Sequence, residues 1–270
     1  MRQILLTLLL LSAASAQAGV KLYVFDCGNL KFDDVSAFGL TNEETSVREL
    51  FVPCYLIEHE NGRLLWDAGL PTAIAGQGPV VMESGAIMEL GRSLPEQLTE
   101  LDLTAADIEQ VAFSHMHFDH VGAANLFSHS TLLIQKTEFE AAFGDELISV
   151  FDPTLYSELA DSKHKLLEGD HDVFGDGSVT IVSAPGHTVG HQVLLLRLAN
   201  FGPLLLSGDL YHFEASRRLR RTPDFNFDKT QTLQAMDKVE ALVEKTGATF
   251  WIEHSKALAD TLKLAPAYYD

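Results

Sequence analysis

The segment His115-Met116-His117-Phe118-Asp119-His120 places three imidazoles and one carboxylate side by side, in the pattern H-x-H-x-D-H. Imidazole nitrogens and carboxylate oxygens are the ligands that zinc and other borderline divalent cations accept. Apolar residues 111–113 before the motif predict a short strand, and residues 121–127 after it predict the start of a helix. The motif is therefore expected in a loop at a strand end, where α/β proteins commonly hold their chemistry.

Three further candidate ligands, His187, Asp209 and His254, each follow directly on a predicted apolar strand. One histidine or aspartate in such a place is an ordinary surface residue, but a set that recurs at successive strand ends is not. We expect these strand ends to point at one location, so the sequence predicts a metal site built from several separate loops.

Strands and helices alternate through both halves of the chain, which predicts a single α/β domain over residues 19–270. Asn61-Gly62 between two apolar runs predicts a hairpin, while Asp228 and Gly247 have the positions of a helix start and stop. Residues 70–92 and 211–227 are predicted to be loops. The predicted strands are 20–27, 53–58, 63–66, 111–113, 131–135, 179–183, 192–198, 203–207 and 248–252; the predicted helices are 94–101, 137–143, 229–245 and 256–264.

Residues 1–18 have the pattern of a signal peptide, because Arg2 precedes an apolar run and Ala16-Gln17-Ala18 fits the small-x-small cleavage rule. We therefore expect a periplasmic or secreted protein that begins at Gly19. The apolar run is far shorter than the roughly 20 residues that span a bilayer, so no membrane association is expected. The net charge of −19 disfavours nucleic acid as a partner, because an acidic surface repels phosphate backbones.

The chain contains two cysteines, Cys27 and Cys54, and both lie in predicted N-terminal strands. In an exported protein they can pair in a disulfide, whereas unpaired they would pack as small apolar groups. Spacing alone does not fix the geometry that a disulfide needs, so both interpretations stay open at this point.

The order of the motifs, H-x-H-x-D-H followed by Gly186-His187, Gly208-Asp209 and a late His254, resembles the metallo-β-lactamase superfamily over nearly all of residues 19–270. The resemblance implies an αββα sandwich with a dinuclear metal site. It implies that one metal is bound by His115, His117 and His187, that the other is bound by Asp119, His120 and His254, and that Asp209 bridges them. An anionic bridge suits two dications about 3.5–4 Å apart, because it offsets their repulsion.

Two further residues near these motifs are candidates for positioning the ligands. Asp67, in Asp67-Ala68-Gly69, resembles the superfamily's Asp-x-Gly turn, which implies that it orients a ligand histidine; a turn-capping aspartate is the alternative. His191 is either a similar supporting residue or an ordinary partly buried histidine. His59, His129, His164 and His171 lack a motif context and are expected at the surface.

Within the superfamily, Asp209 disfavours a true β-lactamase, and His117 disfavours the diiron flavoproteins. The acidic charge disfavours the nucleases, and the short segment after His254 disfavours glyoxalase II. Segments 52–57, 65–69, 208–211 and 251–254 resemble the N-acyl-homoserine lactonases. This resemblance implies a hydrolase that uses two Zn²⁺ ions and a metal-bridging hydroxide to open the lactone ring of a small-molecule substrate.

In this hypothesis Asp119 and Asp209 balance the metal charge, and Asp209 moves a proton to the leaving alkoxide. The lactonases place a tyrosine three residues after the bridging aspartate, but here Tyr211 is two residues after Asp209 and His212 is three after. Both are candidates for the hydrogen bond to the developing oxyanion. Candidates for an acyl pocket, or otherwise for the core, are Phe118, Met82, Ile87 and Met88.

Other functions remain open at the level of sequence. A thioesterase or another ester hydrolase would use the same ligand set, and a periplasmic metal-binding protein is the alternative without catalysis. The lactonase resemblance is compatible with a homodimer, with residues 70–92 as either an interface or a lid. The basic residues Arg217, Arg218, Arg220 and Arg221 either steer an anionic substrate or pair with nearby acids.

Overall fold

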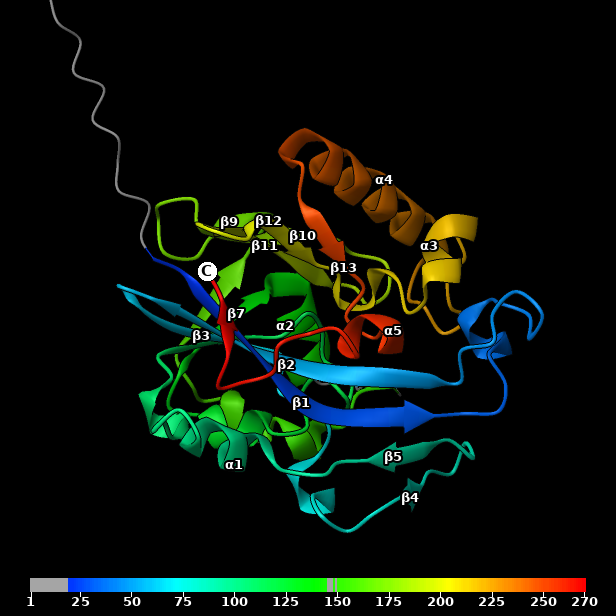
Figure 1. Ribbon diagram of the computed structural model, residues 1–270, viewed down its shortest axis with the longest axis horizontal. Coiled ribbons are helices and arrows are strands. Elements are labelled where there is room, and N and C mark those ends of the chain that lie inside the picture. The colour runs from blue at the N-terminus through cyan, green and yellow to red at the C-terminus, as the bar shows by residue number, and fades with distance from the viewer. Residues whose placement is uncertain (1–18, 145–147, 149) are drawn as a thin grey trace, which may run out of the picture.

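The computed structural model describes residues 19–144, 148 and 150–270 of the protein (Figure 1). The predicted signal peptide, residues 1–18, lies outside the described residues. Over the part of the chain that the structure describes, no helix is long and apolar enough to cross a membrane.

Two β-sheets stack face to face to form the centre of the molecule (Figure 1). The first sheet has the order β4-β5-β1-β2-β3-β6-β7-β8, and the short C-terminal strand β14 also pairs with β1. The second has the order β13-β12-β11-β10-β9. The first sheet contains β1 (Lys21–Lys31), β2 (Glu49–His59), β3 (Gly62–Trp66), β4 (Val80–Val81), β5 (Ile87–Glu89), β6 (Gln110–Ala112), β7 (Thr131–Gln135), β8 (His164–Leu167) and β14 (Tyr268–Tyr269). The second contains β9 (His171–Asp172), β10 (Val179–Ser183), β11 (Gln192–Leu198), β12 (Gly202–Leu206) and β13 (Thr249–Trp251).

Three apolar clusters hold these layers together, since each sheet face buries large aliphatic and aromatic side chains. The cluster between the sheets contains Tyr55 and Trp66 from the first and Leu194 and Leu206 from the second, all inaccessible to solvent. The first sheet packs on its outer face against α1 and α2, and the second against α4. The helices are α1 (Leu94–Thr99), α2 (Lys136–Phe143), α3 (Glu214–Leu219), α4 (Lys229–Thr246) and α5 (Lys256–Ala259). This arrangement confirms the predicted αββα sandwich.

The hairpin around Asn61-Gly62 and the limits of α4 are confirmed. β2 and β3 pair in antiparallel register through His59 and Gly62. The Asp228 side chain accepts a hydrogen bond from the Gln231 amide at the start of α4, and Gly247 ends the helix in the left-handed conformation at φ +68°.

Several predicted segments differ from the structure. Residues 70–92 are not a plain loop, because β4 and β5 form a hairpin that extends the first sheet by pairing with β1. Residues 211–227 contain α3, whereas the helix predicted from residue 121 is only a 3₁₀ turn over Ala124–Phe127, and α5 ends before 264. These short elements are stabilised by tertiary contacts, which a local pattern does not contain.

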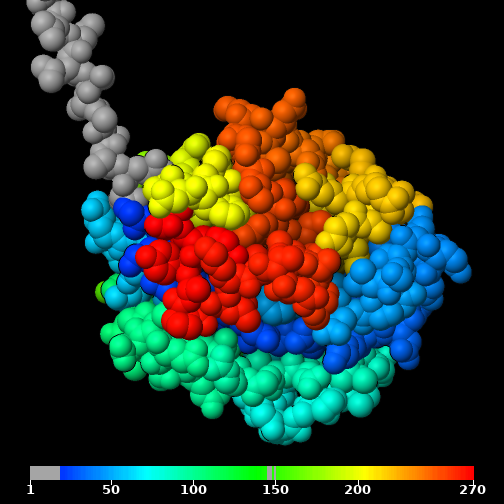
Figure 2. All heavy atoms as spheres, in the orientation of Figure 1, coloured from blue at the N-terminus to red at the C-terminus, as the bar shows by residue number. Residues whose placement is uncertain are grey.

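The two chain ends of the described region lie together on the surface (Figure 2). There the C-terminal strand β14 pairs with the beginning of β1. Further along β1, Cys27 and Cys54 form a disulfide that joins β1 to β2. The turn at Gly69 packs directly against it, because a side-chain carbon at Gly69 would lie 2.3 Å from the Cys27 Cβ. The disulfide therefore supports the Asp67-Ala68-Gly69 turn from behind.

Candidate metal centre

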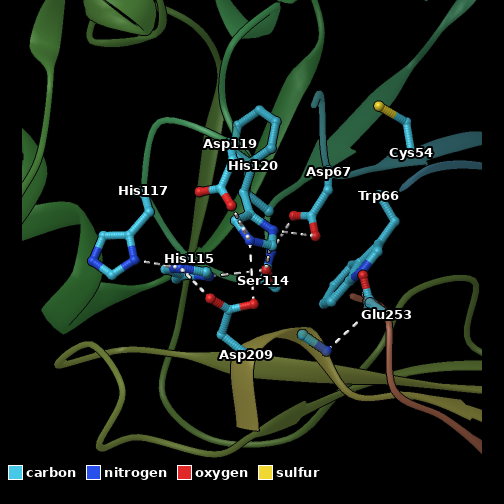
Figure 3. A network of polar contacts seen from close by, with 12 residues as sticks. Cys54, Trp66, Asp67, Ser114, His115, His117, Asp119, His120, Asp209 and Glu253 are labelled. Atoms are coloured by element: carbon cyan, nitrogen blue, oxygen red, sulfur yellow. Dashed lines mark hydrogen bonds and ion pairs between the residues drawn. The ribbon is translucent and has the colours of Figure 1, made fainter. Parts of the chain in front are cut away.

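All seven predicted ligands converge at one end of the sandwich and form two adjacent groups. The first ligand group consists of His115, His117, His187 and Asp209, and the second consists of Asp119, His120 and His254. Every one of these side chains is buried. In Figure 3, dashed lines join the Asp209 carboxylate to His115 and to His120.

Each group draws ligands from both sheets. The H-x-H-x-D-H loop follows β6 in the first sheet, while His187, Asp209 and His254 follow β10, β12 and β13 in the second. The strand ends therefore meet at one location, as the sequence predicts. The centre forms only when the two sheets are docked on each other.

The carboxylate of Asp209 has one oxygen directed at each group. Its Oδ2 lies 3.2 Å from His187 Nε2 and 3.6 Å from His115 Nε2. Its Oδ1 lies 2.8 Å from His254 Nε2 and 3.3 Å from His120 Nε2. This is the geometry of a bridging carboxylate, and it agrees with the role that the resemblance implies for Asp209.

The donor set fits divalent cations. In the first group, His115 Nε2, His117 Nδ1 and His187 Nε2 lie 2.8–3.1 Å from one another. Around the second group, His120 Nε2, His254 Nε2 and the Asp209 Oδ1 that faces them are buried without a hydrogen-bond partner among the described residues. Buried polar atoms without partners are costly, and several lone pairs aimed at one point are stabilised by a cation.

Electrostatics at the centre also favour cation binding. Burial, together with the neighbouring imidazoles of His120 and His117, holds the pKa of His115 well below its usual range. Burial alone would raise the pKa of Asp209, but the surrounding histidines outweigh it and hold that pKa well below normal. His115 is therefore a neutral imidazole and Asp209 an ionised carboxylate, which are the protonation states that bind metals.

Asp67 orients a ligand histidine, as the resemblance implies. Its Oδ2 lies 2.9 Å from His120 Nδ1, and its Oδ1 accepts a hydrogen bond of 2.6 Å from the Ser114 amide. The carboxylate therefore directs His120 Nε2 toward the metal position and holds the start of the ligand loop. Asp67 adopts the left-handed conformation at φ +57°, which aspartate tolerates better than most residues.

Other ligands are oriented by groups that the sequence did not reveal. Asn226 Oδ1 lies 2.9 Å from His187 Nδ1, and the Phe51 carbonyl lies 2.7 Å from His254 Nδ1. His191 is a supporting residue, since its Nε2 accepts the hydrogen bond donated by the Asp209 amide. None of these partners is close in sequence to its ligand, so no local signal could have indicated the first two.

The turn that carries Asp209 is held by a buried carboxyl group. Glu253 Oε1 accepts hydrogen bonds from the Gly208 amide at 2.7 Å and from the Trp66 indole at 3.4 Å (Figure 3). Burial raises the pKa of Glu253 to about 8. Gly208 has φ +47°, and a side-chain carbon there would lie 2.7 Å from His191 Nε2. Only glycine fits this position.

Tyr211 and His212 lie in different places, which corrects the inclusion of Tyr211 as a site residue. The Tyr211 hydroxyl donates a hydrogen bond of 3.0 Å to Glu240 on α4, and its ring belongs to the apolar cluster beneath that helix. His212 Nε2, by contrast, lies 3.0 Å from Asp209 Oδ2. The alternation of side chains along extended backbone at Tyr211 explains why neighbours face opposite ways.

An apolar groove of about 530 Å³ lies beside the centre. Phe118, Met82, Phe38 and Phe225 line it, and the rings of Phe38 and Phe225 lie 5.0 and 6.0 Å from the His212 ring. Of the four predicted acyl-pocket candidates, Phe118 and Met82 line the groove. The other two, Ile87 and Met88, lie in β5, where they pair with β1.

Two expectations about outlying residues are settled by the structure. His59 is buried rather than exposed, stacked at 4.2 Å on Phe174 and paired with Asp176.

Three arginines of the basic cluster pair with acids, which supports the interpretation as a solvated face. These pairs are Arg217 with Glu240, Arg220 with Asp237, and Arg221 with Glu44.

Comparison with known proteins agrees with this arrangement. The family model of the metallo-beta-lactamase superfamily matches residues 47–246. The chain is 30% identical to N-acyl homoserine lactonase AttM of Azorhizobium caulinodans, over 93% of this chain and 99% of that protein. It is 28% identical to N-acyl homoserine lactonase AiiA of Bacillus thuringiensis subsp. kurstaki, over 92% of this chain and 98% of that protein.

Solved structures show the same fold. An N-acyl homoserine lactone hydrolase with the product N-hexanoyl-L-homoserine at its catalytic metal centre superposes with a TM-score of 0.79 at 25% identity, covering 92% of this chain and 98% of that one. The sandwich and its two ligand groups define a metal-dependent hydrolase. The chain belongs to the metallo-β-lactamase superfamily.

Proposed function

We propose that this protein hydrolyses the lactone ring of N-acyl homoserine lactones, with two zinc ions held by the two ligand groups. The observation that carries the proposal is the Asp209 carboxylate, which directs one oxygen at each group beside an apolar groove. The lactonases AttM and AiiA, each matched over almost their full length, support this substrate class.

The ligand groups supply the charge and geometry that such a site needs. His115, His117 and His187 would hold one ion, Asp119, His120 and His254 the other, and Asp209 would bridge them. When bound, the ions polarise the lactone carbonyl and make water a nucleophile at neutral pH. AidC, which has the same fold, is described as a dizinc lactonase, and this supports the same metal and count here.

The residues of this chain then divide the reaction between them. Water adds to the carbonyl carbon, and the bond from that carbon to the ring oxygen breaks. A carboxylate oxygen of Asp209 receives a proton from the attacking water and passes it to the leaving alkoxide. The products are one carboxylate and one hydroxyl on the same opened chain, and the remaining proton goes to solvent.

We assign the polar contact with the reacting carbonyl to His212 rather than Tyr211. His212 lies between Asp209 and the aromatic wall of the groove, formed by Phe38 and Phe225. A lactone whose acyl chain occupies the groove would therefore present its ring to His212 and to the ligand groups. The apolar side chains of Phe38, Phe118 and Phe225 in the groove lining support an acyl chain as the second recognition element.

We further propose that the protein acts outside the cytoplasm, in the periplasm or after secretion. The sequence pattern of residues 1–18 supports export. The Cys27–Cys54 disulfide also supports it, because disulfides persist mainly in oxidising compartments. Cell fractionation with a cytoplasmic marker tests this directly, and a protein of unprocessed mass in the cytoplasm would contradict it.

The activity is tested with the zinc-loaded protein, residues 19–270, on a short-chain and a long-chain N-acyl homoserine lactone. We expect ring opening that a chelator abolishes and added zinc restores. The same assay with an acyl thioester tests the alternative enzyme class. Faster turnover of the thioester, or no opening of either lactone with both metals bound, would contradict the proposal.

A further inference from the structure

We propose that Glu138 is the positioning residue of the first ligand group, because it ties together the two loops that supply its three histidines. The inference rests on the two-ion site proposed above, but it concerns how this chain holds the site rather than which substrate it takes.

Glu138 makes two hydrogen bonds to two different ligand loops. Its Oε1 accepts from the Met116 amide at 3.0 Å, and its Oε2 accepts from the Gly190 amide at 2.7 Å. Met116 lies between the ligands His115 and His117, and Gly190 lies three residues after His187. One carboxylate thus fixes the spacing between the loops from β6 and β10.

The environment of Glu138 indicates that these bonds are the reason for its position. The side chain is only 1% exposed, on the face of α2 that packs against the sandwich. A buried carboxylate is costly unless it is paired or strongly hydrogen-bonded, and two amide donors supply that stabilisation. Neighbouring Glu140, by contrast, is exposed on the same helix.

The backbone of the second loop is shaped to approach Glu138. A side-chain carbon at Gly190 would lie 2.5 Å from the Glu138 Cβ and 2.7 Å from its backbone nitrogen. Any larger residue would push the loop of His187 away from α2. Gln135, at the start of α2, reinforces this contact, because its side chain donates a 3.1 Å hydrogen bond to the side chain of Gln192. The backbone amide of Gln192 in turn donates to the Ser114 carbonyl.

These contacts separate Glu138 from the second ligand group. In the second group, His120 is supported instead by Asp67, and His254 by the Phe51 carbonyl. Loss of the Glu138 bonds should therefore loosen one metal position and leave the other in place. A residue that only stabilised the fold would affect both positions together.

The test is a metal titration of the metal-free protein, residues 19–270, with zinc and a competing chelator, resolving the two binding steps. In Glu138→Gln the amide nitrogen faces one backbone N–H, so one hydrogen bond is lost. In Glu138→Asp the charge is kept, but the shorter side chain cannot reach both amides. We expect both variants to weaken one step by roughly 10–100-fold and to leave the other unchanged.

Glu140→Gln is the matched control, because it removes the same charge from the same helix, and it should titrate like the wild type. His254→Gln disables the second group, and in that background Glu138→Gln should weaken the remaining site.

Unchanged binding steps in a folded Glu138→Gln variant would overturn the proposal, as would equal weakening of both steps. Wild-type behaviour of Glu138→Asp would also overturn it, because the shorter side chain cannot make both amide contacts. If the wild type binds a single ion, the two-ion proposal fails. The role of Glu138 is then supported if Glu138→Gln weakens the binding of that ion, and contradicted if the affinity is unchanged.

Discussion

The His191 side chain holds the backbone of Asp209 and does not hold the Asp209 carboxylate. The Asp209 amide donates to His191 Nε2 at 2.9 Å, and His191 Nδ1 donates to the Ala184 carbonyl at 3.0 Å. The two hydrogen bonds together fix the neutral tautomer and ring orientation of His191. The Asp209 carboxylate remains free to face both ligand groups.

Replacing His191 with Phe should therefore weaken both metal-binding steps, in contrast to Glu138. The ring volume is retained, but the Asp209 amide loses its acceptor and the bridging carboxylate loses its fixed position. We expect a fall of roughly 10–100-fold in affinity at each step, measured by the same zinc titration. His129→Phe, at an exposed histidine, is the control. Wild-type affinities in a folded His191→Phe protein would refute this role.

Asp209→Asn tests the bridge itself. The amide keeps the shape of the side chain but removes the negative charge between two dications and the group that transfers the proton. We expect the rate of lactone opening to fall by about 10²–10⁴-fold, since general acid–base catalysis contributes on that order. Metal content is measured on the same sample. A variant that binds two ions and keeps its rate would exclude the proposed role.

Met82→Ala tests the groove as an acyl site. Removing an apolar wall should cost roughly 1–3 kcal/mol for a chain long enough to reach it. We expect kcat/KM for a long-chain lactone to fall by about 10-fold or more, with little change for a short-chain one. Val81→Ala is the neighbouring control, because Val81 is 69% exposed and is not part of the groove lining. Equal losses on both substrates would argue against an acyl groove.

The disulfide should contribute measurably to stability. It joins residues 27 positions apart in the sequence, and closing a loop of that size stabilises a fold by about 3 kcal/mol. We expect the Cys27→Ala/Cys54→Ala variant to lose that amount in urea unfolding of the metal-free protein. A reductant should destabilise the wild type and leave the double variant unaffected. No difference between the two proteins would show that the bond contributes nothing.

Asp176 should make stability depend on pH at the acidic end. Hydrogen bonds from the Ser178 hydroxyl and amide lower its pKa to about 2. Its stabilising contribution is therefore complete above the unfolded-state value near 4 and is lost as the pH falls through about 2. Because Asp176 is partly exposed, we expect the effect to stay below about 1 kcal/mol. Urea unfolding of metal-free wild type and Asp176→Asn between pH 5 and 2 should show the two curves converging.

The ligand set could be predicted from the sequence because each ligand lies in a loop that follows an apolar strand. His115, His187 and Asp209 are short-range features of this kind, and the docking of two sheets then brings them together. The disulfide could not be decided in advance, since pairing depends on the register of β1 with β2. The alternation of strands and helices predicted a single α/β domain, and the resemblance of the motif order to the metallo-β-lactamase superfamily implied the sandwich.

Apart from Asp67 and His191, the supporting residues could not be predicted from the sequence. Glu138, Asn226 and Glu253 reach the ligand loops across the fold, and nothing near them in the chain marks them as partners of a site. Tyr211 shows the opposite error. Its position beside Asp209 suggested a shared location, but extended backbone directs it to α4 instead.

Each ligand group contains residues from both sheets, and this has a consequence for how the fold and the site are maintained. Neither half of the chain holds a complete set of ligands, so a metal ion bound by either group also cross-links the two layers. The ions should then raise the temperature at which the layers separate, and the stabilisation should grow with the logarithm of one plus their concentration divided by their dissociation constant. Selection for metal affinity in such a protein acts, at the same time, on the interface between its two sheets.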